Sequence, residues 1–270
     1  MSDDHGHPAR RAPTPRPIAT WFPLWRPAPQ ARARLLCIPC AGRGASVYRG
    51  WRDLLPGVEI LAAQLPGREH RIGESPLHDI EPILDGLVTA IGLLPQPKAG
   101  PLPLAVFGHS LGGIVGFALC RRLAGAGGPT HLFVAACRAA HMPPPRRLSH
   151  QDLPTILDRL VAMGGLSPQA RTEPELMAIV EPMLRADLTL AESSRANPEP
   201  PLSIPITVLG GIDDGLVGQE ELDGWSRLTT AGCDVRRVPG GHFFVLDDPP
   251  AVAGIISNRW PPGPTASTPR

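Results

Sequence analysis

The sequence lacks the long hydrophobic runs and the surplus of one charge that mark membrane proteins and nucleic-acid-binding proteins. No segment of its 270 residues approaches the roughly 18–20 consecutive apolar residues that a membrane-spanning helix needs. The formal net charge is only +1, which gives no general electrostatic reason to expect a nucleic-acid or membrane partner. Residues 1–17 also lack the apolar segment of a signal peptide, so we expect a cytoplasmic protein.

The sequence also lacks the cysteine pattern of a disulfide framework or a metal site. Its five cysteines are an odd number scattered through apolar segments, so reduced core residues fit them better. Cys37 and Cys40 form a single C-x-x-C pair, but a zinc site would need a second pair and a redox site would need a helix start. We therefore expect neither a metal nor another cofactor.

One large domain is expected between two flexible tails. Residues 1–30 are rich in proline and arginine without periodicity, and residues 262–270 have a similar character, so both ends are predicted to be flexible. Residues 31–261 lie between them. With 42% hydrophobic residues in the whole chain, that length is enough for one α/β domain with a sizeable core.

Short apolar runs alternate with helical patterns through this domain. Most of the runs are apolar almost throughout, as strands buried on both faces of a parallel sheet are. The alternation predicts a mainly parallel sheet flanked by helices, and residues 78–94 carry apolar side chains at helical spacing. The expected strands are 34–39, 58–64, 102–108, 131–137, 205–211 and 233–240.

Between residues 143 and 201 the alternation of strand and helix is interrupted. Two consecutive helical segments, 150–166 and 173–193, stand between proline-rich hinges. They suggest a helical lid inserted over the carboxyl edge of the sheet. Ordinary crossover helices on a face of the sheet are the alternative.

A serine between two glycines is the first sign of chemistry. Gly108, Ser110 and Gly112 form G-x-S-x-G, a pattern short enough to occur by chance. Here it follows a predicted buried strand and precedes a helical segment that runs from Leu111 through Arg122 to a glycine cluster. That context predicts a nucleophile elbow, a sharp turn that lifts the serine hydroxyl above the sheet.

A nucleophilic Ser110 needs a base and an acid that orients the base, and α/β-hydrolases supply them in the chain order Ser, Asp or Glu, His. His242 follows a Gly-Gly turn after the last predicted strand and precedes two phenylalanines, so it is the candidate base. The candidate acid is Asp214, which lies one residue further into its loop than the alternative, Asp213.

Two backbone N–H groups are expected to stabilise the oxyanion of a tetrahedral intermediate. One belongs to Leu111, directly after the nucleophile, and the other to Ala41 in the glycine-rich loop after the first predicted strand. Cys40 in the same loop and Phe243 after the candidate base are expected to line the substrate site.

With these residues in place, the chain resembles the type II (external, editing) thioesterases of polyketide and nonribosomal peptide synthesis, which have the α/β-hydrolase fold. The segments that carry the resemblance are LLCIPCAGRGAS, VEILAAQLPGREHR, FGHSLGG, HLFVAACRAA, MLRADLTLAES, ITVLGGIDD and VPGGHFFV, in that order. The resemblance implies hydrolysis of acyl groups from the phosphopantetheine thiol of an acyl or peptidyl carrier protein. It matches Ser110, Asp214 and His242 to the catalytic triad and residues 143–201 to a lid that meets the carrier.

The resemblance also matches the Ala41 and Leu111 amides to the oxyanion hole, but two segments depart from the family pattern. Members usually have Pro-His-Ala-Gly-Gly where residues 39–43 read Pro-Cys-Ala-Gly-Arg, so Cys40 replaces a histidine. The lid segment commonly ends Glu-x-Tyr, whereas here Glu192 is followed by two serines.

Arg68 and Arg71 have two interpretations. Arginines beside a Pro-Gly turn are most often solvated surface charges. The functional alternative is that they contact an acidic carrier protein or the phosphate of pantetheine.

Other activities stay open at this point. The same triad would serve an acyltransferase or cyclase that passes the acyl group to an alcohol or amine, or a small-molecule esterase or lipase. A catalytically idle hydrolase fold that binds carrier proteins is a further alternative. We expect the protein to be a monomer.

Overall fold

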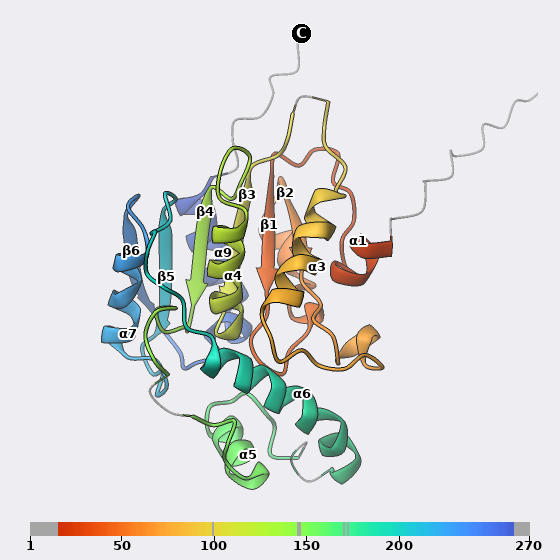
Figure 1. The fold of residues 1–270 in the computed structure, drawn as a ribbon, viewed down its shortest axis with the longest axis vertical. Helices are drawn as coiled ribbons and strands as arrows, with labels where there is room; N and C mark the ends of the chain where they lie inside the picture. The colour runs from red at the N-terminus through yellow and green to blue at the C-terminus, as the bar shows by residue number, and fades with distance from the viewer. Residues whose placement is uncertain (1–15, 99, 145–146, 170, 172, 262–270) are drawn as a thin grey trace, which may run out of the picture.

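A parallel sheet forms the centre of the molecule (Figure 1). The structure is a computed structural model, and it describes residues 16–98, 100–144, 147–169, 171 and 173–261. Among these residues the strands are ordered β2-β1-β3-β4-β5-β6, and each pairs in parallel with its neighbours. The strands are β1 (Ala33–Ile38), β2 (Val58–Ala62), β3 (Leu104–His109), β4 (His131–Ala135), β5 (Ile206–Gly211) and β6 (Cys233–Val238). Each falls within or overlaps one of the predicted apolar runs, so the predicted strand pattern is confirmed.

Helices cover both faces of this sheet (Figure 1). One face carries α1 (Arg16–Trp21), α3 (Glu81–Gly92), α4 (Leu111–Arg122) and α7 (Gln219–Asp223). The other face carries α2 (Trp51–Leu54), α8 (Phe244–Asp247) and α9 (Pro249–Arg259). Short 3-10 helices span η1 (Ala45–Tyr48), η2 (Glu69–Arg71) and η4 (Gly224–Leu228).

Each face of the sheet has its own apolar core. On one face α3 buries Ile83, Leu84 and Leu87, part of the helical stripe expected from the sequence. On the other face Trp51 packs against Phe107 of β3, with ring centroids 4.9 Å apart. Because both faces are covered, every residue of β1, β3, β4 and β5 is buried. This is why those strands are almost continuously apolar.

Two helices, α5 (Leu153–Ala162) and α6 (Pro174–Ser193), lie beyond the carboxyl ends of the strands (Figure 1). Asp152 caps α5 by accepting a hydrogen bond from the Thr155 N–H at 2.8 Å. The buried side chains of α6 recur at helical spacing and include Met183, Leu184, Asp187 and Leu190. The predicted helical lid is therefore confirmed, while residues 145–146, 170 and 172 of the insertion lie outside the described residues.

The N-terminal segment differs from the flexible tail expected over residues 1–30. It contains α1, and Trp21 packs so closely on α3 that a Cβ added at Gly86 would lie 1.9 Å from the Trp21 ring. The buried apolar side chains of α1 and of the residues that follow it are Ile18, Trp21, Phe22 and Trp25. The surrounding prolines obscure this segment in the sequence. The folded domain therefore begins well before residue 31.

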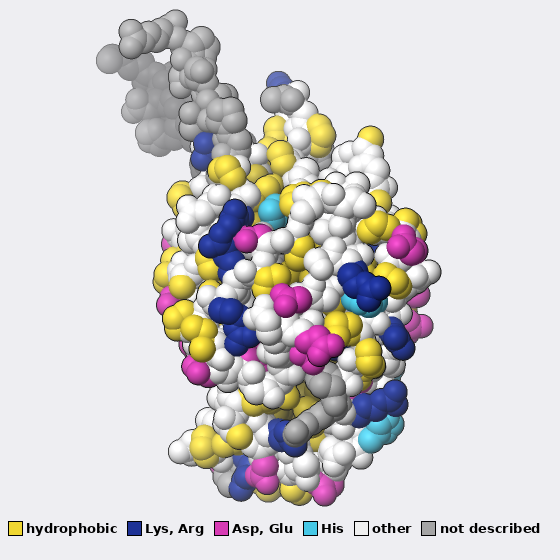
Figure 2. Space-filling view, turned by 90° about the vertical axis from the view of Figure 1, so that its left-hand side faces the viewer, with side chains coloured by type: hydrophobic (Ala, Val, Ile, Leu, Met, Phe, Trp, Pro, Cys, Tyr) yellow, Lys and Arg dark blue, Asp and Glu magenta, His cyan; other side chains and the backbone are white. Residues whose placement is uncertain are grey.

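The side of the molecule beside β6 carries positive, negative and apolar side chains intermingled (Figure 2). This mixing agrees with the net charge of +1. In the described part of the chain no helix is long and apolar enough to cross a membrane. Within the same part no group of His, Cys, Asp and Glu is arranged to hold a metal ion. Residues 1–15 and 262–270 of the expected tails lie outside the described residues.

Replacing Ile18 by alanine tests whether α1 belongs to the folded domain. Because Ile18 is fully buried, its truncation leaves a cavity, and we expect the free energy of unfolding to fall by about 2–4 kcal/mol in chemical denaturation. Ala19 is exposed on the same helix, so Ala19→Ser should change that energy by less than about 0.5 kcal/mol. Equal values for the two variants would mean that α1 is not part of the cooperative fold.

Candidate active site

Ser110 lies on a strained turn between β3 and α4. Its backbone has φ 54° and ψ −114°, a region that residues with a side chain rarely adopt. A Cβ added at Gly108 would lie 2.1 Å from the Gly112 carbonyl oxygen, and one added at Gly112 would lie 2.1 Å from the Ile38 carbonyl oxygen. Both glycines of G-x-S-x-G are therefore required by close backbone contact. The turn has the geometry expected of a nucleophile elbow.

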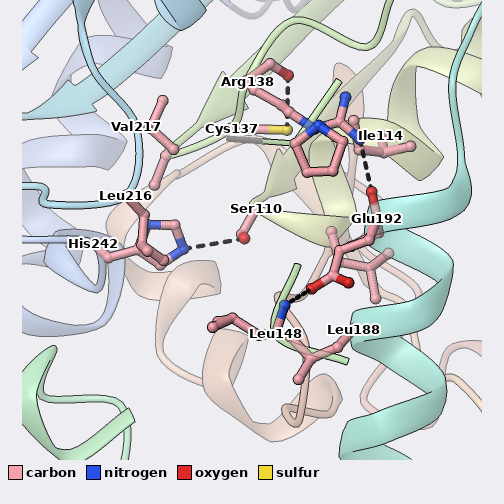
Figure 3. A pocket seen from close by; sticks show the side chains of 14 residues that line it. Ser110, Ile114, Cys137, Arg138, Leu148, Leu188, Glu192, Leu216, Val217 and His242 are labelled. Atoms are coloured by element: carbon pink, nitrogen blue, oxygen red, sulfur yellow. Dashed lines mark hydrogen bonds between the residues drawn. The ribbon is translucent and has the colours of Figure 1, made fainter. Parts of the chain in front are cut away.

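His242 and Asp214 lie in line with the serine hydroxyl. His242 Nε2 is 3.1 Å from Ser110 Oγ (Figure 3), and His242 Nδ1 is 2.9 Å from Asp214 Oδ2. Asp214 follows β5 and His242 follows β6, so the carboxyl ends of adjacent parallel strands bring the two side chains together. The structure thus places the three residues selected from chain order in one hydrogen-bonded row, while the alternative acid, Asp213, is exposed.

The Asp214 carboxylate is held in its charged form. Burial acts to raise its pKa, but the hydrogen bond with His242 opposes this. The N–H groups of Leu216 and Val217 donate to the same carboxylate at 2.8 and 3.3 Å, and together these bonds hold the pKa below its usual range. A lowered folded-state pKa stabilises the fold above the unfolded pKa, and this contribution is lost as the pH falls through the folded value. An ionised Asp214 fixes the proton on Nδ1 and leaves Nε2 to accept the serine proton.

A second histidine, His109, supports the loop that carries His242. Its Nε2 lies 2.9 Å from the His242 carbonyl oxygen. Burial, together with the nearby His242, lowers the pKa of His109 to about 3. The ring is therefore neutral near pH 7, and Nε2 must carry the proton that it donates to the carbonyl. Nothing in the sequence pattern singles out His109, because its partner lies far along the chain.

The two expected oxyanion donors lie in different settings. Leu111 is the first residue of α4, so its N–H has no partner within the helix. It also lines the pocket beside Ser110. Ala41 lies in the loop after β1 and is not one of the described residues that line this pocket. The roles of both amides stay predictions, and Leu111 is the better placed.

The lid helix α6 holds the loop that contains Ala41. Asp187 of α6 accepts a hydrogen bond from the Gly42 N–H at 2.8 Å. The same carboxylate forms a bidentate ion pair with Arg68, whose Nη1 and Nη2 lie 2.5 and 2.8 Å from its two oxygens. The Arg68 and Asp187 side chains are only 5% and 2% exposed, so water screens this pair weakly. A displacement of α6 would therefore be transmitted to the loop.

Arg68 and Arg71 do not have the exposed positions considered for them in the sequence. Both are buried. Arg71 donates to the two carboxylate oxygens of Glu74 at 2.8 and 2.6 Å and to the Gln64 carbonyl at 2.9 Å. Its guanidinium also lies 4.6 Å from the centroid of the Trp21 ring. The interpretation as solvated surface charges is therefore wrong, because the two guanidinium groups form ion pairs inside the domain. The contact with a carrier protein stays a prediction.

A mainly apolar pocket opens beside Ser110 and His242 (Figure 3). We call it the acyl pocket. Its walls come from α4, from α6 and from the segments that follow β4 and β5. The apolar side chains that line it include Ile114, Leu148, Leu188, Leu216 and Val217. Such a lining suits a hydrocarbon chain attached to a carbonyl group at the serine.

Two residues expected to line the substrate site lie outside the acyl pocket. Cys40 is 2% exposed, and burial raises the pKa of its thiol to about 12. Phe243 packs edge-on against the His242 ring, with centroids 5.3 Å apart and an interplanar angle of 81°. Neither residue is among the described residues that line the acyl pocket, so their expected contact with substrate stays a prediction. Proximity in sequence to a site residue does not place a side chain in its pocket.

Two charged residues that line the acyl pocket tie the end of α6 to neighbouring segments. Arg138 follows β4 and donates to the carbonyls of Ala191 and Ser194 at 2.8 and 3.1 Å. A cation in this position stabilises the helix C-terminus. Glu192 accepts a hydrogen bond from the Leu148 N–H at 2.6 Å. No local sequence pattern predicts either contact, because each joins segments that are remote in sequence.

Comparisons with known proteins agree with this geometry. A model of the thioesterase domain matches residues 33–260. The chain belongs to the thioesterase family. This thioesterase is similar to the gramicidin S biosynthesis protein GrsT of Aneurinibacillus migulanus, with 33% identity over 85% of this chain and 90% of that protein. It is also similar to thioesterase PikA5 of Streptomyces venezuelae, with 32% identity over 91% of this chain and 89% of that protein.

Solved structures of thioesterases share the fold. YbtT, a type II thioesterase from the yersiniabactin NRPS/PKS biosynthetic pathway, has a TM-score of 0.79 and 30% identity, covering 88% of this chain and 96% of its own. RedJ, a thioesterase from the prodiginine pathway of Streptomyces coelicolor, has a TM-score of 0.76 and 29% identity, covering 89% and 98%. The predicted α/β-hydrolase fold, the resemblance to type II thioesterases and the assignment as a thioester hydrolase are confirmed.

Replacing Asp214 by asparagine tests which aspartate orients the base of this thioesterase. An amide cannot stabilise the charged imidazolium and favours the wrong tautomer of His242, so we expect kcat for thioester hydrolysis to fall by about 10⁴-fold. Asp213→Asn is the matched control, because the Asp213 side chain is exposed, and it should keep near-wild-type kcat. A large loss in the control with a small loss in Asp214→Asn would reverse the assignment.

Two substitutions at Asp187 test the link between lid and loop. Asp187→Ala leaves Arg68 buried without its partner, so we expect the free energy of unfolding to fall by about 3–5 kcal/mol. It also releases the Gly42 N–H, so kcat should fall. Asp187→Asn keeps an oxygen that can accept from Gly42, so it should recover most of kcat but not the stability of the ion pair. Equal kcat values in the wild type and both variants would show that the loop does not depend on α6.

Proposed function

We propose that this protein hydrolyses acyl groups from the phosphopantetheine thiol of acyl or peptidyl carrier domains. It would thereby free polyketide or nonribosomal peptide assembly lines that carry wrong or stalled units. The observation that carries the proposal is the hydrogen-bonded row from Asp214 through His242 to Ser110 at the acyl pocket. The likeness to YbtT, which belongs to an NRPS/PKS pathway, supports a carrier-bound thioester as the substrate.

The first half of the proposed reaction transfers the acyl group to the enzyme. Ser110 Oγ attacks the thioester carbonyl while His242 Nε2 takes the hydroxyl proton. The oxyanion is stabilised by the N–H of Leu111 and, by our prediction, that of Ala41. The carbon–sulfur bond then breaks, and His242 returns the proton to the departing thiol. Asp214 stabilises the imidazolium that exists between these two proton transfers.

The second half releases the acid. Water attacks the acyl-serine carbonyl, His242 takes a proton from the water, and the carbon–oxygen bond to Ser110 breaks. His242 then gives the proton back to the serine oxygen, which restores the resting site. The net reaction consumes one water and yields a free carrier thiol and a carboxylic acid. Neither half requires a redox step.

The proposed site needs one copy of the chain. Ser110, His242 and Asp214 and the side chains of the acyl pocket all come from the same chain, so we propose that the protein acts as a monomer. The carrier protein is proposed to approach at the lid, because α6 lies over the edge of the sheet where the serine is found (Figure 1). The expected cytoplasmic location stays a prediction.

A stand-alone carrier protein with an acyl group on its phosphopantetheine provides the direct test. Intact-protein mass spectrometry follows the mass of the carrier during incubation with wild-type protein or with Ser110→Ala. We expect the wild type to convert the acylated carrier to the free-thiol form with release of the acid. Ser110→Ala lacks the nucleophile and should slow this conversion by about 10⁴-fold or more.

Two results would contradict the proposal. If the acyl group stays on the carrier with both proteins, for short, branched and long chains alike, the protein does not edit carrier-bound thioesters. If the group leaves only when an alcohol or amine acceptor is added, the protein is an acyltransferase or cyclase instead.

A further inference from the structure

A second pocket lies beside the acyl pocket, between α4 and the end of α6. Its buried lining is apolar and includes Phe117, Ala140 and Leu190. Its exposed lining residues are polar or charged and include His78 and Arg195. The exposed residues must lie at its mouth and the buried ones at its inner end. The second pocket therefore has an apolar floor that is closed from solvent and a polar opening at the surface.

Ile114 is the one described residue that lines both pockets. α4 contributes to the acyl pocket between residues 111 and 114 and to the second pocket between residues 114 and 118. α6 also lines both pockets. Because α4 runs along both, the pockets follow one another along its axis, and the Ile114 side chain stands between them. That side chain is 4% exposed, so it is a packed part of the wall.

The direction of the acyl chain follows from the position of the base. His242 protonates the leaving thiol, so the sulfur departs on the side of Ser110 that faces His242. The hydrocarbon chain must then extend to the other side, where Figure 3 shows Ile114. Residue 114 lies one helical turn after Ser110, about 6 Å along the axis. A chain of modest length therefore reaches Ile114.

We propose that Ile114 forms the end wall of the acyl pocket and sets the longest linear acyl chain that this protein accepts. The inference rests on the proposed function and adds to it a residue that determines chain length. Shortening the Ile114 side chain would join the two pockets. The apolar floor at Phe117 and Leu190 would then receive the tail of a long chain, whereas a short chain would gain no contact.

The test compares thioesters of butyric, octanoic and dodecanoic acid on the phosphopantetheine arm, with kcat/KM as the readout. In Ile114→Ala the ratio of kcat/KM for the dodecanoyl thioester to kcat/KM for the butyryl thioester should rise by at least about tenfold. Each additional methylene group that an apolar pocket can bind discriminates between substrates by about tenfold or more. Ile114→Val disturbs packing less and should give a smaller rise in the same direction. The octanoyl value should lie between the other two.

Two further variants separate this effect from general loosening of the core. Leu119 is fully buried on the same helix and lines neither pocket, so Leu119→Ala should leave the dodecanoyl-to-butyryl ratio at the wild-type value. Ala118 lines the second pocket, so adding Ala118→Leu to Ile114→Ala fills the new space. The double variant should return the ratio towards the wild-type value.

The outcomes distinguish the inference from the proposed function. An unchanged ratio in Ile114→Ala and Ile114→Val, with butyryl hydrolysis preserved, would overturn the role of Ile114 and leave the proposed function intact. An equal rise in Leu119→Ala would overturn it as well. If the wild type hydrolyses none of the three thioesters, the proposed function fails and the role of Ile114 fails with it.

Discussion

The close backbone turn at Ser110 is the constraint on which the rest of the site depends. A positive φ at a residue with a side chain costs on the order of 1–3 kcal/mol, and it persists here because β3 is buried between β1 and β4. Gly108 and Gly112 leave room for α4 to begin directly against the sheet. That start places the Leu111 N–H and the positive end of the helix dipole beside the serine oxygen. The position of the base, the expected oxyanion donors and the acyl pocket are all set relative to this turn.

Hydrogen bonds and a buried ion pair join the lid helix α6 to the segments around the active site. One carboxylate, Asp187, joins α6 to the Gly42 N–H and to Arg68 in a buried group. Arg138 joins the end of the same helix to the segment after β4. Moving the middle of α6 away would break the Asp187–Arg68 pair and leave an uncompensated buried charge. The hydrogen bonds of Arg138 hold the end of the helix. Such rigidity suits donors that must be oriented before charge develops on the substrate.

Features that depend on neighbours in the sequence were predictable, and features that depend on remote contacts were not. Apolar runs identify the strands, and the glycines around Ser110 identify the elbow, because both are local requirements. The pairing of Asp214 with His242 was also predictable, because parallel strands have their carboxyl ends at a common edge of the sheet. The partner of Arg68 lies 119 residues away, so no local pattern distinguishes this buried cation from a surface one. The edge-on packing of Phe243 against His242 is likewise a detail of side-chain direction that the sequence does not specify.

The most direct test of this account is to identify the residue that carries the acyl group during turnover. Enzyme and acylated carrier protein would be mixed, quenched in acid within milliseconds, digested and examined by tandem mass spectrometry. The geometry predicts the acyl mass on the peptide that contains Ser110, appearing before the free acid and decaying as the acid forms. Acylation of another side chain, such as the Cys137 thiol that also lines the pocket, or steady hydrolysis without an acyl group on Ser110, would contradict it.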